Sequence, residues 1–96
     1  SSARRAFLLE LDSRLKALAN RIRYFKQFLK LKEKSIAQAQ KTYDFTELNY
    51  RRGLASNSDV LLARKMLIEA KYSKEKLVFN LQVIGAEIEN LLGKNL

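Results

Sequence analysis

The most constraining feature of this sequence is a heptad repeat of apolar residues that runs along the chain twice, with one interruption. In the first run, steps of three and four residues place apolar side chains at eleven of thirteen seam positions, and in the second run only Lys74 departs from the pattern. A repeat sustained over about six heptads predicts long α-helices that pair along a single seam. The seams comprise Leu8, Leu11, Leu15, Leu18, Ile22, Phe25, Leu29, Lys32, Ile36, Ala39, Tyr43, Thr46 and Tyr50, and then Val60, Ala63, Leu67, Ala70, Lys74, Leu77, Leu81, Ile84, Ile88 and Leu91.

The interruption between the two runs has the residues of a helix end followed by a helix start. Gly53 is the first glycine, and the chain has no proline. Glycine adopts the left-handed conformation that ends many helices, and Ser56 is suited to cap the next helix, with Asp59 adding a carboxylate to its first turn. We therefore predict an all-α antiparallel two-helix coiled-coil hairpin, with a helix over about 3–52, a turn at 53–57 and a helix over about 57–93.

The two seams also predict a register. Antiparallel pairing of residues whose numbers sum to about 110 places Tyr43 beside Leu67 and Leu29 beside Leu81. The first helix is then longer than the second, so residues before about Leu15 are expected to project beyond the pair or to pack on another chain.

Composition excludes most catalytic chemistry. The chain has no cysteine and no histidine, which removes thiolate sites and the commonest general base and metal ligand. The ten carboxylates are scattered, and no glycine-rich phosphate loop is present. We expect neither an enzyme nor a cofactor.

No apolar run approaches the about 20 residues of a membrane span, so direct membrane insertion by these residues is not expected. We also expect a single domain over 1–96, and for an exported protein any signal peptide would lie outside this stretch.

A second set of apolar residues lies away from the seams. A lone hairpin would leave these side chains in water, and exposed apolar rows of this size mark a partner surface. They suit lateral packing in a wall of side-by-side helices, and the alternative is a compact dimer that forms a four-helix bundle. The candidate lateral residues are Tyr24, Phe28, Leu31 and Phe45 on the first helix, and Leu61, Ile68, Tyr72 and Phe79 on the second.

The formal charge of +9 is concentrated in one zone. Eight basic residues lie between Arg14 and Lys34, with Glu33 as the only acid. Three interpretations of this zone remain: a solvated helix, contact with acidic neighbours, or binding of nucleic acid or an anionic membrane. No nucleic-acid recognition motif is present and the charges lie around the helix, so no nucleic-acid partner is expected.

The turn carries a motif of a known family. The pattern Tyr50-x-x-Gly53-Leu54-x-Ser56-x-x-Asp59-Val60-Leu61-x-Ala63-Arg64, followed by Ala70 and Leu91-Leu92-Gly93, resembles the repeat of TolC-like outer-membrane efflux proteins. The resemblance spans roughly residues 37–93. The chain has one repeat where the family has two, and no strands for a barrel, so it is interpreted as a hairpin excised from a larger protein. Arg52 stands where the family commonly has an apolar residue.

The resemblance implies a function and a location. It implies the periplasmic part of a Gram-negative outer-membrane protein, in which trimers form a helical tunnel for multidrug efflux or type I secretion. The tunnel tips dock onto hairpins of a periplasmic adaptor (membrane fusion) protein, and this contact carries over to Arg52, Gly53, Leu54, Ala55 and Ser56. Two alternatives remain: the hairpin of the adaptor itself, or a basic coiled coil that binds nucleic acid or anionic membrane.

Overall fold

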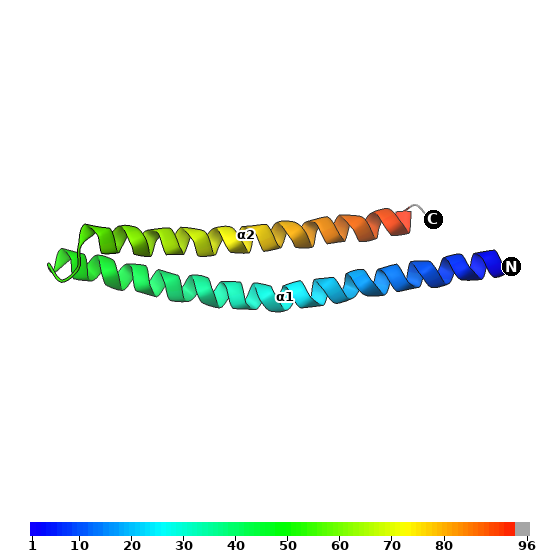
Figure 1. Ribbon diagram of the computed structural model, residues 1–96, viewed down its shortest axis with the longest axis horizontal. Coiled ribbons are helices and arrows are strands. Elements are labelled where there is room, and N and C mark those ends of the chain that lie inside the picture. Colours follow the sequence, from blue (N-terminus) through cyan, green and yellow to red (C-terminus); the bar gives the residue numbers. More distant parts are fainter. Residues whose placement is uncertain (94–96) are drawn as a thin grey trace.

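The computed structural model describes residues 1–93 and contains two long helices. Helix α1 (Ser2–Arg51) and helix α2 (Asn57–Gly93) run antiparallel, joined by residues 52–56, so the start of α1 and the end of α2 lie towards the same end of the molecule (Figure 1). The molecule is a rod with extents of 77 × 18 × 15 Å. The predicted all-α hairpin is confirmed, and its helix boundaries are correct to within one residue.

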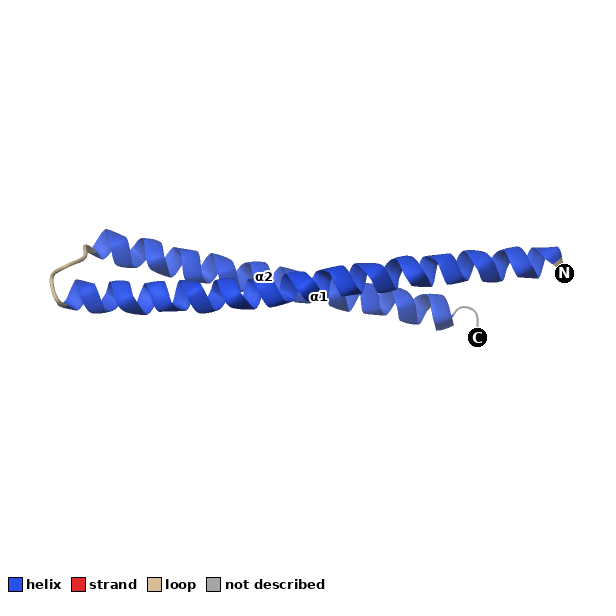
Figure 2. Ribbon diagram, turned by 90° about the horizontal axis from the view of Figure 1, so that it is seen from below, coloured by secondary structure: helices blue, strands red, loops and turns tan. Residues whose placement is uncertain are grey.

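Most of the stability of these helices comes from packing of their seam faces against each other rather than from helix propensity. Ser1 caps α1, because its hydroxyl accepts a hydrogen bond of 3.3 Å from the Arg4 amide. No glycine or proline follows until Gly53, and α1 continues for 50 residues to Arg51. In Figure 2 the two helices cross in projection near the middle of the hairpin, so the pair is twisted about its long axis.

The contact between the helices follows the predicted seams. The most buried side chains are Leu18 on α1 and Ala63, Leu67, Leu77 and Ile84 on α2, and every one is a seam residue. From Leu11 to Thr46, and from Val60 to Leu91, all other seam positions are half-buried. A core one side chain wide is what two helices can make, because each has only one flank covered.

The register lies close to the predicted pairing, because residues that meet across the two helices have numbers that sum to 107–109, against the predicted value of about 110. Among the described residues, one ion pair joins the two helices, between Lys74 Nζ of α2 and Glu33 Oε1 of α1 at 3.7 Å. Leu18 shares a groove with Leu91, and further along the rod Lys32 shares another with Leu77.

The polar seam positions are accommodated in different ways. Thr46 donates its hydroxyl to the carbonyl oxygen of Thr42 at 2.7 Å, which satisfies this group within its own helix. Lys32 and Lys74 are half-buried, as expected of lysines whose stems lie along a seam while their ammonium groups reach water. Lys74 also has the carboxylate of Glu33 within ion-pair distance.

The N-terminal part of α1 extends beyond α2. Phe7, Leu8 and Leu9 are exposed, and burial along the seam begins at Leu11 and deepens at Leu18. This agrees with the expected projection of residues before about Leu15. Within residues 1–93, neither helix carries an apolar stretch long enough to cross a membrane.

Candidate functional site: the tip of the hairpin

The end of α1 is closed by a Schellman motif centred on glycine. Gly53 has φ +75°, and its amide donates to the Tyr50 carbonyl at 3.1 Å. The Leu54 amide donates to the Asn49 carbonyl at 2.8 Å, and Arg52 is the C-cap residue. These two bonds satisfy carbonyls that a helix end leaves free, and they require the left-handed conformation that glycine adopts at little cost. The direction in which the chain leaves α1 is therefore set by its own backbone.

The start of α2 is closed by a reciprocal pair of hydrogen bonds. The Asp59 amide donates to Ser56 Oγ at 3.1 Å, and the Ser56 amide donates to Asp59 Oδ2 at 2.9 Å. This is a capping box in which aspartate takes the place of the usual glutamate. The Val60 amide then donates to the Ser56 carbonyl at 3.3 Å as the first bond of the helix.

The capping box also changes the acidity of its carboxyl group. The backbone amide of Ser56, and after it the Ser56 hydroxyl, hold the pKa of Asp59 below its usual value of 3.8, with a smaller opposing effect from desolvation. Asp59 is therefore ionised at neutral pH, where its charge also favours the N-terminal end of α2. Local hydrogen bonds thus hold the tip on both sides.

The side chains presented at this tip are small or fully exposed. Leu54 is 75% exposed, the largest exposed fraction among the large apolar residues of the described chain. In many Schellman motifs the residue at this position packs back against the last turn of the helix, but here Leu54 stays in solvent. Arg52 and Ser56 are exposed, Ala55 is half-buried, and a Cβ placed on Gly53 would meet no atom within 4 Å. The tip therefore offers one uncovered leucine with open space beside it.

Three arginines lie near the tip, and one of them is paired. Arg51 Nη2 lies 2.6 Å from Oε1 of Glu47, one turn earlier in α1. Arg52 and Arg64 have no ion pair with any carboxylate of residues 1–93. Asp44, a further carboxylate of α1, accepts a hydrogen bond of 3.0 Å from Gln40. Two cations thus remain available at the tip.

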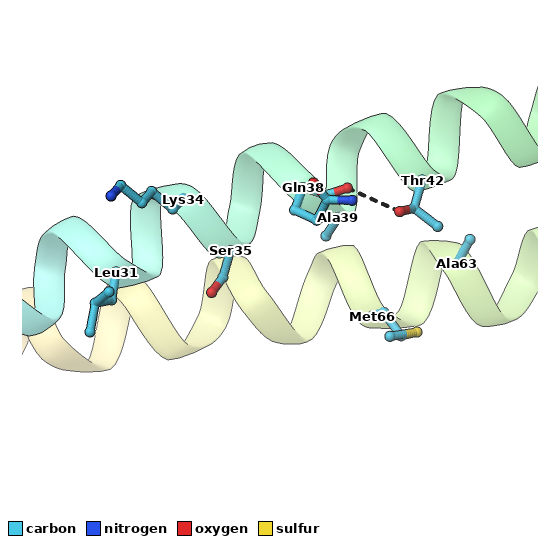
Figure 3. Close-up of a pocket in the computed structure, with 8 residues that line it drawn as sticks. All are labelled: Leu31, Lys34, Ser35, Gln38, Ala39, Thr42, Ala63 and Met66. Carbon is cyan, nitrogen blue, oxygen red and sulfur yellow. Dashed lines mark hydrogen bonds between the residues drawn. The ribbon is translucent and has the colours of Figure 1, made fainter.

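Grooves follow one flank of the hairpin from the tip towards its middle. In the groove drawn in Figure 3, Ser35 and Ala39 of α1 face α2, and Thr42 donates to the Gln38 carbonyl at 3.1 Å. The groove forms because the short side chains on this side of the hairpin do not fill the space between the helices. Met66 of α2 lines both this groove and the next one towards the tip, where Leu62 and Phe45 also contribute.

The candidate lateral residues lie on the surface. All eight are exposed, namely Tyr24, Phe28, Leu31, Phe45, Leu61, Ile68, Tyr72 and Phe79. Leu48, Leu62, Met66 and Val83 are exposed as well and were missed by the sequence analysis. Leu62, Met66 and Val83 repeat at intervals that place them on one side of α2, so a count of this second helical face would have found them.

The described residues contain no cluster of three or more acidic side chains that suits a metal ion. No protein family, curated protein or solved structure matches the chain. The function is therefore argued from the hairpin itself and from its turn motif.

Proposed function

We propose that this hairpin is a wall segment of a TolC-like outer-membrane efflux or secretion tunnel, and that its tip docks onto the helical hairpin of a periplasmic adaptor protein. In this proposal the full-length protein is a trimer and the hairpin lies in the periplasm. The proposal rests on the turn motif from Tyr50 to Arg64 and on the way this turn is built.

The geometry of the tip supports a docking role. Hydrogen bonds within the turn hold residues 52–56, through Gly53 on one side and the Ser56–Asp59 capping box on the other. A tip held in one conformation loses little conformational entropy on binding, which favours affinity. Its small residues allow a second hairpin to approach the backbone closely.

The single observation that carries the proposal is the exposure of Leu54. An apolar side chain left 75% exposed at the end of a rod contributes little to the fold. Its burial in a partner's pocket would stabilise a complex by roughly 1.5–3 kcal/mol. Arg52, which has no ion pair in the described chain, lies two residues away and would add charge selectivity at the rim of the contact.

The exposed lateral residues support a wall. A helix of a tunnel wall has a neighbour on both sides, and each helix here has an apolar row that α1–α2 pairing leaves uncovered. Tyr24, Phe45, Tyr72 and Phe79 are among the large side chains that a neighbouring hairpin would bury.

The test is binding of the hairpin to a panel of adaptor hairpins, measured by isothermal titration calorimetry. We expect one adaptor to bind, and Leu54→Glu to weaken this binding at least about tenfold, because losing 1.5–3 kcal/mol corresponds to roughly one to two decades in Kd. Circular dichroism should show unchanged helicity, because Leu54 makes no core contact that the fold needs.

The matched control is Leu9→Glu, since Leu9 is also an exposed leucine but lies at the opposite end of the rod. It should leave adaptor binding unchanged. Equal effects of the two substitutions, or binding that survives Leu54→Glu, would exclude the tip as the docking site. Binding to tunnel-side hairpins instead of adaptors would mean that the chain is itself an adaptor hairpin.

A further inference from the structure

The middle of α1 carries a block of cations that the fold does not neutralise. Within the described chain, six basic residues have no carboxylate within 4.0 Å: Arg21, Arg23, Lys26, Lys30, Lys32 and Lys34. The two basic residues before this block are paired, Arg14 with Glu10 at 2.9 Å and Lys16 with Asp12 at 3.0 Å. The only acid inside the block, Glu33, is shared with Lys74 of α2.

An exposed apolar patch lies within this block. It consists of Tyr24, Phe28 and Leu31, which follow one another at steps of four and three residues and so share one side of the helix. Tyr24 is 57% exposed and Leu31 is 56% exposed. The rings of Tyr24 and Phe28 pack edge to face with their centroids 4.7 Å apart. We call these three residues the aromatic patch.

Cations flank the aromatic patch on both sides. Arg23 and Lys30 each precede a patch residue by one position, which places them about 100° around the helix on one side of it. Lys34 lies three residues after Leu31 and falls on this same side. Arg21 lies on the other side, with its guanidinium 6.0 Å from the centre of the Phe25 ring. The surface therefore has an apolar centre and basic edges.

The combination of an exposed aromatic patch with flanking cations favours some classes of partner over others. A second copy of the chain that packed its own aromatic patch against this one would oppose two basic blocks, so repulsion disfavours this pairing. Duplex nucleic acid would attract the cations but leave the aromatic patch unused. The interface of an anionic bilayer uses both, because aromatic and aliphatic side chains settle at headgroup depth while Lys and Arg reach the lipid phosphates.

We propose that the aromatic patch and its flanking cations bind the surface of an anionic phospholipid bilayer, at headgroup depth and without crossing it. This inference is independent of adaptor docking, which uses the other end of the rod. In an assembled tunnel wall the lateral residues would be covered, so surface binding belongs to the chain before assembly. Neighbouring hairpins would then displace the lipid.

The test is co-sedimentation of the whole hairpin with vesicles of phosphatidylcholine, alone or with one quarter phosphatidylglycerol, at low and at physiological salt. We expect binding to the anionic vesicles only. The triple variant Arg23→Gln/Lys30→Gln/Lys34→Gln should lower the partition coefficient by about a hundredfold, because each cation near an anionic surface contributes a factor of about five.

The matched control is Lys41→Gln/Arg64→Gln/Lys71→Gln, which removes three cations that are likewise outside the ion pairs of the described chain but lie away from the patch. It should change the partition coefficient much less. Equal losses for both triple variants would overturn the proposal, because binding would then follow net charge alone. Absence of binding to anionic vesicles at low salt would overturn it as well.

A second pair of substitutions separates lipid from nucleic acid. Tyr24→Ser/Leu31→Ser keeps every charge and should weaken vesicle binding at least about tenfold, while leaving binding to a duplex DNA of mixed sequence unchanged. Vesicle binding unaffected by this variant would exclude the aromatic patch. Leu54→Glu should leave vesicle binding intact, so failure of this proposal and failure of adaptor docking give different results.

Discussion

Replacement of Gly53 by alanine tests whether the turn between the helices is held as the structure shows. Gly53 has φ +75°, a conformation that costs an L-residue roughly 1–2 kcal/mol. A Cβ at this position would meet nothing within 4 Å, so no steric clash adds to this conformational cost. We therefore expect Gly53→Ala to lower the free energy of unfolding by about 1–2 kcal/mol.

Gly85 provides a matched control with the opposite sign. It lies inside α2 with helical backbone angles, and a Cβ there would also meet nothing within 4 Å. Gly85→Ala should raise the free energy of unfolding by roughly 0.5–1 kcal/mol, because alanine loses less backbone entropy on entering a helix. The same chemical change is thus expected to destabilise at one position and stabilise at the other.

The assay is urea unfolding followed by circular dichroism at a fixed protein concentration. With a slope of about 1–2 kcal/mol per molar urea, the midpoints of the two variants should differ by roughly 1–2 M. A Gly53→Ala midpoint equal to or above that of the parent would refute the reasoning, since residue 53 would then not be held at positive φ. A Gly85→Ala midpoint below the parent would show that a neighbour occupies the space beside Gly85.

Two further predictions concern polar groups in the turn and the seam. Because hydrogen bonds with Ser56 lower the pKa of Asp59, its contribution to stability is present above pH 3.8 and is lost as the pH falls through the lower, folded-state pKa. Urea midpoints measured from pH 6 to pH 2 should fall less steeply in Asp59→Asn than in the parent, and identical slopes would contradict the capping box. Lys74→Met should raise the free energy of unfolding by about 1 kcal/mol by placing an apolar side chain at a half-buried seam position. The control for loss of the exposed ion pair is Glu33→Gln, which should change the free energy of unfolding by less than about 0.5 kcal/mol. A lower free energy of unfolding in Lys74→Met would contradict the assignment of Lys74 to the seam.

Much of the candidate site was predictable because turn geometry depends on short-range interactions. Gly53, Ser56 and Asp59 act through hydrogen bonds that span three to five residues, so the residue types themselves indicate the end of one helix and the start of the next. The lateral residues were predictable for a related reason, since a helix pair covers only one face of each helix.

Other features depended on distances between the helices and were not predictable. The ion pair between Lys74 and Glu33 joins groups 41 positions apart in the chain, and it forms because the register places them on the same flank. The grooves lined by Met66 and Leu62 arise where short side chains of both helices meet, which depends on the rotation of each helix about its axis.

The sequence by itself determined the two helices, their antiparallel seam, their approximate register and the position of the turn. These follow from heptad spacing and capping residues, whose effects are local or repeat many times along the chain. Only the tertiary structure decided how far Leu54 is exposed, at 75%, and which of the cations around Tyr24 and Phe28 lack a carboxylate partner in the described chain. Exposure and charge pairing depend on what the opposite helix brings within reach, and this is set by packing in three dimensions.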